Sequence, residues 1–142
     1  MKMKPFAKIA LAIVLIIAIG GILGALYMYN LKPKDLKRVK PDFVITAVEL
    51  TAAFNEDGKA ATDKYVNKII EVSGEISSVM PGEKGAVNIQ LESGNNVTSV
   101  ICTIQNAGNN KTFEPGKAIT LRGVCSGFLM DVLLNNCVVV EK

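Results

Sequence analysis

Three cysteines are the residues of this 142-residue chain best suited to specific chemistry, and the sequence contains no histidine. Cys102, Cys125 and Cys137 stand apart from one another, with no C-x-x-C pair among them. Zinc sites need clustered Cys and His ligands, which sequence motifs present as close pairs. A redox or metal site is the rival interpretation, and the isolated spacing speaks against it. The sequence therefore predicts no metal site and no cofactor.

Cys125 and Cys137 are predicted to form a disulfide if the domain is exported. They fall in the last two predicted strands with 11 residues between them, so a bond would staple the closing hairpin. In the chain-entropy view, a loop of this length adds about 2–3 kcal/mol of stability. Cys102 shares the face of Val100 and Ile104 and is predicted to be a buried thiol.

Acid–base catalysis has little support in this sequence. Without histidine, a general base would have to be Asp, Glu or Lys, and these residues are scattered over faces that are predicted to point outward. The segment 123–127 reads G-V-C-S-G, which is not the G-x-S-x-G spacing of a nucleophile elbow. Asp131 is expected to bond the turn amides after Gly127, which is a structural role. We predict no catalytic residue and no enzyme activity.

The elements that would position these residues are strands, because polarity alternates with a period of two from Lys68 onward. Such runs cover residues 68–77, 87–92, 99–104, 119–123 and 132–140. Short turns join the first three strands, and a longer connection leads to the last two. This layout predicts a mostly β fold, the five-stranded Greek-key barrel called the OB-fold, with Gly74 bending its first strand. An N-terminal helix, capped by Thr46 and Glu49, runs to about Asn55 and is expected to plug a barrel end.

Ahead of the barrel, the run from Ile9 to Met28 carries no charge and predicts one transmembrane helix. We divide the chain into a signal anchor (1–29), a basic linker (30–41) and the OB-fold domain (42–142). A cleaved secretory signal and a buried helix of a soluble fold are the alternatives. No Cys lies near the end of the run, which excludes bacterial lipid attachment there. Gly20 and Gly24 form a G-x-x-x-G, so a homodimer through this helix is a possible arrangement.

Charge separates the anchor from the domain. Residues 42–142 hold eight basic and 12 acidic side chains, a formal net charge of −4, while the positive charge lies in residues 1–41. The linker is expected to be extended or disordered because it has too few apolar residues to fold. Lysines flank both ends of the span, so charge alone leaves its orientation open. We expect the domain to be extracytoplasmic, since a short basic tail before one span behaves as a signal.

Barrels of this kind usually bind ligands on the second and third strands and on the bordering loops. The residues that would form this face are Asn88, Gln90, Glu92, Ser99, Ile101 and Thr103, with Phe128 in a bordering loop. Binding of single-stranded nucleic acid needs stacking aromatics and a basic groove. The strand face has neither, and only Phe128 could stack. A solvated polar face without a ligand is the simpler interpretation, and a neutral polar ligand such as a glycan is the functional one.

A resemblance to the tRNA anti-like family of OB-fold domains covers nearly all of residues 45–141. It rests on the segments 52–56, 64–65, 70–74, 100–102 and 121–127, and on the C-x-G-x-x-x-D-V-x-L-x-x-C pattern from Cys125 to Cys137. The resemblance implies an anticodon-binding type of barrel, often placed after a membrane or lipoprotein anchor. It implies no established activity, because a fold does not fix a function.

We therefore interpret the chain as a membrane-anchored, extracytoplasmic OB-fold module that binds an envelope protein or a glycan. The alternative is a single-stranded nucleic-acid-binding domain on the cytoplasmic side, which the negative charge of the domain disfavours. An enzyme would need clustered acidic side chains in a cleft, and the sequence displays no such cluster.

Overall fold

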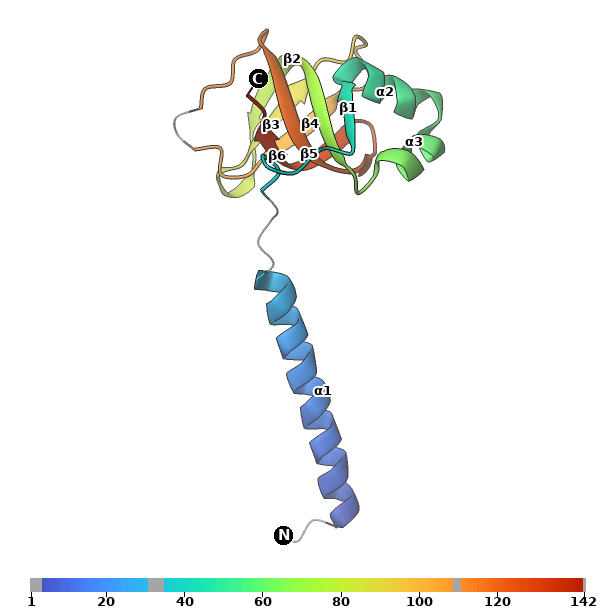
Figure 1. Cartoon of the computed structure of the whole chain (residues 1–142), viewed down its shortest axis with the longest axis vertical. Coiled ribbons are helices and arrows are strands. Elements are labelled where there is room, and N and C mark those ends of the chain that lie inside the picture. Colours follow the sequence, from blue (N-terminus) through green and yellow to red (C-terminus); the bar gives the residue numbers. More distant parts are fainter. Residues whose placement is uncertain (1–3, 31–34, 109–110, 142) are drawn as a thin grey trace. The chain divides into compact units, whose positions relative to one another are not determined.

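The structure of the chain is a computed structural model that describes residues 4–30, 35–108 and 111–141. The chain divides into two compact units, Met1–Lys34 and Asp35–Lys142 (Figure 1). Parts of the predicted anchor (1–3) and of the predicted linker (31–34) lie outside the described residues.

The first unit is one helix, α1 (Pro5–Asn30), with apolar side chains on every side. At 26 residues it is about 39 Å long. By length and composition it could cross a membrane, and no residue of it is buried in the protein. Its three glycines, Gly20, Gly21 and Gly24, have open space where a Cβ would stand.

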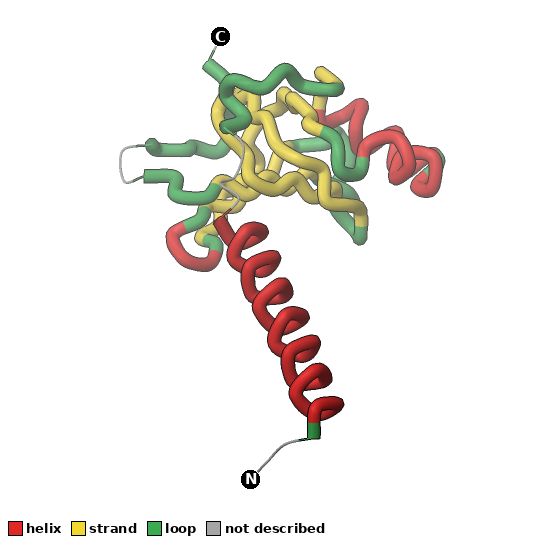
Figure 2. Tube along the Cα trace, turned by 60° about the horizontal axis from the view of Figure 1, so that its bottom comes forward, coloured by secondary structure: helices red, strands yellow, loops and turns green. Residues whose placement is uncertain are grey.

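The second unit is a closed barrel of five strands, as the alternating pattern predicted. The barrel strands are β2 (Ile69–Pro81), β3 (Val87–Leu91), β4 (Val100–Ile104), β5 (Ala118–Phe128) and β6 (Val132–Val139). They follow the order β2-β3-β4-β6-β5, and a β2–β5 pairing closes the ring. The strands are the yellow segments of the tube in Figure 2. All pairings in the ring are antiparallel except β4 with β6. A 3-10 turn, η1 (Glu83–Gly85), joins β2 to β3. The segment between β4 and β5 has no helix among its described residues.

Three short elements precede the barrel strands: β1 (Phe43–Thr46), α2 (Ala47–Glu56) and α3 (Gly58–Tyr65). The sequence pattern missed β1, which pairs in parallel with the first half of β2. Thr46 caps α2 as predicted. Its hydroxyl oxygen accepts a hydrogen bond from the backbone amide of Glu49, and the Glu49 carboxylate accepts one from the backbone amide of Thr46. α2 and α3 lie at one side of the barrel in both views (Figures 1 and 2).

Strand β2 serves both sides of the barrel, because its first half pairs with β5 and its second half with β3. The change of partner falls between Glu75 and Ile76, just after Gly74. A Cβ built on Gly74 would lie 3.1 Å from the Cβ of Ala47 and 3.4 Å from that of Leu91. Glycine therefore lets the start of α2 approach the strand closely, and a Cβ at this position would require Ala47 to move by a few tenths of an ångström.

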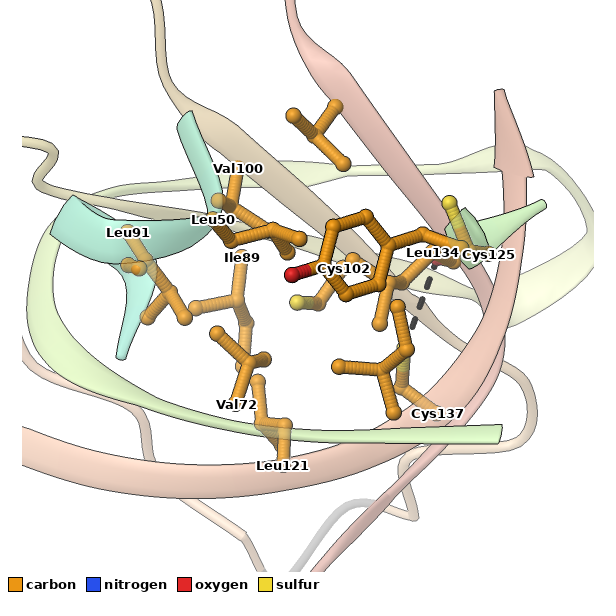
Figure 3. Packing of buried hydrophobic residues seen from close by; sticks show 14 of the residues in the cluster. Leu50, Val72, Ile89, Leu91, Val100, Cys102, Leu121, Cys125, Leu134 and Cys137 are labelled. Carbon is orange, nitrogen blue, oxygen red and sulfur yellow. Dashed lines mark hydrogen bonds between the residues drawn. The ribbon is translucent and has the colours of Figure 1, made fainter. Parts of the chain in front are cut away.

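Aliphatic side chains from every strand fill the barrel. Leu50 and Phe54 of α2 are buried in the same cluster. Figure 3 shows Leu50 within the same cluster as Val72, Ile89 and Val100. The helix thus closes the barrel interior, as the sequence analysis expected.

The segment before β1 contradicts one expectation. Residues 35–41 were expected to be extended or disordered, yet Leu36 is 2% exposed. The guanidinium of Arg122 on β5 donates to the carbonyls of Leu36, Lys37 and Val39. The same side chain forms an ion pair with Glu71 at 2.6 Å, and both partners are almost fully buried. One buried arginine thus holds residues 35–41 against the barrel. The composition of this segment did not predict the contact.

The predicted disulfide is wrong. Cys102, Cys125 and Cys137 are all free and buried, as expected only for Cys102. Cys125 lies opposite Leu134, because two irregularities shift the β5–β6 register and Asn136 adopts a left-handed φ of 53°. The Cys137 thiol donates to the Leu134 carbonyl instead (Figure 3, dashed line). Local register, which the spacing of the cysteines does not encode, separates the two sulfurs.

Candidate functional site: a polar pocket between β3 and β4

Strands β3 and β4 bring most of the predicted ligand face together. Asn88 lies opposite Thr103 and Gln90 lies opposite Ile101. The hydroxyl of Thr103 donates to the amide oxygen of Asn88 at 2.8 Å. All four side chains are half-buried.

The other three predicted residues are placed differently. Glu92 lies just past β3 and is exposed, while Ser99 lies just before β4 and is 7% exposed. Phe128 is not part of this face. Its ring stacks on Phe54 of α2, with centroids 5.2 Å apart and planes at 22°. The aromatic residue that could have stacked on a base is therefore engaged in packing.

Four side chains form a continuous line of hydrogen bonds across this region. Ser78 on β2 bonds the Gln90 amide oxygen at 2.8 Å, and the Gln90 amide nitrogen bonds the Ser99 hydroxyl at 2.9 Å. The line ends at Asp131, whose Oδ1 accepts from the Ser99 hydroxyl and from the Ser99 backbone amide, both at 2.8 Å. Asp131 thus bonds Ser99, the residue just before β4, whereas the sequence analysis expected it to bond its own turn.

The carboxylate fixes the direction of every bond in this line. An ionised carboxylate only accepts, so Ser99 must donate to it. The Ser99 oxygen is then free to accept from the amide nitrogen of Gln90. The amide oxygen of Gln90 must in turn face Ser78, which donates. Hydrogen bonds aligned in one direction polarise one another, so the negative charge at Asp131 orders all four groups.

The loop between β3 and β4 is held rigidly beside this line. The Asn95 amide oxygen accepts from the backbone amides of Val97 and Thr98. The hydroxyl of Ser93 bonds the Thr98 carbonyl, and the hydroxyl of Thr98 bonds Asn55 of α2. Such Asx-type bonds replace regular secondary structure and fix the loop without it.

Together these residues line a polar pocket of about 220 Å³. Its walls are Ser77, Gln90, Leu91, Glu92, Ser93, Asn95, Asn96, Val97, Thr98, Ser99 and Asp131. Among these described residues two, Glu92 and Asp131, are acidic and none is basic. Sequence reasoning found Gln90, Glu92 and Ser99 but missed the loop and Asp131 as a member of the site. The N-x-x-T spacing from Asn95 was the available signal for an ordered loop.

The described residues hold no group of three or more His, Cys, Asp or Glu side chains that could bind a metal ion. Two of the thiols, those of Cys102 and Cys125, are also poor nucleophiles. Hydrogen bonding to Cys137, followed by burial, raises the pKa of Cys102 well above its ordinary value. Burial likewise raises the pKa of Cys125. Nucleophilic chemistry needs the thiolate, so these groups do not support it.

A closed five-stranded barrel with a ligand face on β3 and β4 defines the class of OB-fold domains. The chain belongs to the tRNA_anti-like family, whose model matches residues 1–139. A solved structure of a lipoprotein from Klebsiella pneumoniae subsp. pneumoniae MGH 78578, described provisionally as nucleic acid-binding, is similar to it. The TM-score is 0.57 at 17% identity, over 78% of this chain and 100% of that one. At this identity the likeness shows the fold alone. No curated protein sequence matches the chain.

Proposed function

We propose that this protein is a membrane-anchored binding module, without enzyme activity, whose ligand site is the polar pocket between β3 and β4. The observation that carries the proposal is the ordered line from Ser78 to Asp131, which lines an open pocket. Binding sites gain affinity when their polar groups are oriented beforehand. The position agrees with the face that OB-folds use for ligands.

The loops around the pocket support a partner larger than a solute. Val97, at the tip of the β3–β4 loop, is 80% exposed. Leu129 and Met130, at the β5–β6 turn, are 84% and 75% exposed. Ser99 and Asp131 tie these two loops together. Exposed apolar side chains beside an ordered polar pocket suit an envelope protein or a glycan with apolar faces.

The anchor in this proposal is α1, with divisions near residues 29 and 41 and with the domain on the extracytoplasmic side. The support is the length and the apolar surface of α1 and the lipoprotein nature of the structural neighbour. A C-terminal alkaline phosphatase fusion should be active, and the matching cytoplasmic reporter silent. The reverse result would contradict the orientation. The proposal also includes a homodimer, because Gly20 and Gly24 would let the helices α1 of two copies approach closely.

Site-directed photo-crosslinking tests the binding function. A photoreactive amino acid replaces Val97 in one variant and Asp63, an exposed residue of α3, in the control. In intact membranes we expect an adduct from position 97 and none from position 63. Adding Ser99→Ala, which cuts the line of hydrogen bonds, should remove the adduct. Identical adducts from both positions, or none from either, would contradict the proposal.

Single-stranded nucleic acid is the second candidate, because the neighbour is described in those terms. The site argues against it here: no basic side chain lines the pocket in the part of the chain that the structure describes, and Phe128 is packed on Phe54. Residues 42–142 also carry a net charge of −4. Binding to phosphate releases counterions and weakens steeply with salt. Salt-sensitive retention of the protein on single-stranded DNA or RNA would favour this candidate over a protein or glycan.

A further inference from the structure

The line of hydrogen bonds in the pocket ends at the carboxylate of Asp131, which can accept further hydrogen bonds. Both hydrogen bonds from Ser99 reach Oδ1 of Asp131, and within the described part of the chain Oδ2 accepts none. An ionised carboxylate can accept about four hydrogen bonds. All the side-chain donors in the line point toward this group. A ligand that reaches Asp131 must therefore bring N–H or O–H donors of its own.

A second carboxylate and its neighbour add negative charge beside the pocket. Glu92 forms part of the pocket wall, and its backbone amide bonds the Glu75 carbonyl at 2.9 Å. The two glutamates are cross-strand neighbours and both side chains are exposed. Like charges in this relation destabilise a sheet. Neither has an ion-pair partner among the described residues. A bound cation would relieve this repulsion.

Glu92 also borders a second, larger hollow. This apolar groove, of about 730 Å³, is lined by Thr46, Val48, Ser73, Gly74, Glu75, Glu92, Gly94, Ala118, Ile119, Thr120, Val139 and Val140. The charged side chains among its described walls, Glu75 and Glu92, are again acidic. The polar pocket and the apolar groove therefore meet at one carboxylate. This arrangement suits a chain that places a cationic side chain on one side of Glu92 and an apolar one on the other.

We propose that the pocket binds the ammonium or guanidinium group of a lysine or arginine in an extended segment of a partner protein. The apolar side chain next to that residue would lie in the groove beyond Glu92. The inference rests on the proposed function and names its ligand class. Charge complementarity carries it: no described residue that lines either hollow is basic, and Asp131 and Glu92 line the same pocket. A guanidinium or ammonium group supplies donors only, which matches a site that offers acceptors.

Synthetic peptides, added to the full-length chain in detergent micelles, test the inference. The probes are eight-residue Ser/Gly peptides that carry Leu-Lys, Leu-Arg or Leu-acetyl-lysine at the centre. Amide NMR shifts of Glu92–Ser99 and Asp131 report the site. We expect saturable shifts with the lysine and arginine peptides and an affinity at least tenfold lower with the acetylated peptide, because acetylation removes the charge and keeps the length.

Two variants complete the test. Asp131→Asn keeps an oxygen for Ser99 and removes the charge, so the protein stays folded while affinity for the basic peptides falls about tenfold. Asp63→Asn removes one exposed charge on α3 and should change nothing. If the acetylated peptide shifts the same amides as strongly, or if Asp63→Asn weakens binding as much as Asp131→Asn, the cation inference is overturned. In the first case the site still binds a neutral ligand, and the proposed function stands. If no peptide moves these amides, the inference fails, and the photo-crosslinking result at Val97 decides the proposed function.

Discussion

The sulfur of Cys137 occupies the space that a side chain on Gly123 would need. A Cβ built on Gly123 would lie 2.5 Å from that sulfur and 3.1 Å from the carbonyl oxygen of Asn135. Strand β6 therefore lies so close to β5 at this point that any side chain larger than that of glycine would force the neighbouring atoms to move. The same contact explains why Cys137 does not face Cys125, two residues farther along β5.

Gly123→Ala should therefore destabilise the barrel. Overpacking of a close contact costs about 1–3 kcal/mol. Thermal unfolding followed by the β-sheet circular dichroism signal measures the loss. Adding Cys137→Ala should recover part of it, because the nearest atom is then gone. A double variant no more stable than the sum of the two single changes would show that the contact is not the cause.

The three thiols should resist modification in the folded protein. All three are buried, and burial raises the pKa of Cys125. Iodoacetamide reacts with the thiolate, so mass spectrometry should find no adduct before unfolding and three after it. An oxidised protein whose peptide map joins Cys125 to Cys137 would contradict the structure.

Stability should fall at alkaline pH. The pKa of Cys102 in the folded protein lies well above its ordinary value, first because of its hydrogen bond to Cys137 and then because of burial. In the unfolded chain the thiol ionises near pH 8.5. The unfolded state therefore loses its proton first, so stability is complete below that pH and declines above it. Urea midpoints between about pH 8 and 10 should show a shallower decline in Cys102→Ala; an equal decline would exclude this thiol as the source.

Arg122 should hold residues 35–41 on the barrel. Replacing it by Met removes the ion pair to Glu71 and three bonds to backbone carbonyls. Breaking a buried pair from one side typically costs about 3–5 kcal/mol. Trypsin should also cleave faster after Lys37 and Arg38. Lys117→Gln is the matched control, because it breaks an exposed ion pair to Glu114 and should leave both readouts unchanged.

Phe128 should act through packing. Its ring stacks on Phe54, which is 2% exposed. Phe128→Ala should lower the stability by about 1–3 kcal/mol, since a half-buried aromatic loses less than a fully buried one. Any weak retention on single-stranded DNA should stay the same in the folded variant. Loss of retention without loss of stability would instead assign Phe128 to a binding face.

Much of the fold follows from local pattern. The alternation in Val87–Leu91 and Val100–Ile104 predicted adjacent strands, and Thr46 with Glu49 predicted the start of α2. These signals work because side-chain alternation and helix capping depend on residues within a few positions of one another. β1 escaped notice because four residues give too short a pattern to separate from a loop.

The sequence predicted only part of the candidate site, because some of its contacts join residues that are far apart in the chain. Gln90 and Ser99 were found because both lie on the outward face of predicted strands. Asp131 was missed as their partner because the bond to Ser99 joins residues 32 positions apart.

By itself, the sequence determined an apolar N-terminal helix, five alternating strands and a family, since each depends on the order of residue types along the chain. Tertiary structure alone decided which side chains meet. It placed Cys137 over Gly123, Arg122 beside Glu71, and Asp131 at the end of the pocket. Bulges and strand register set these contacts, and a shift of one residue in register turns every side chain of a strand to the other face.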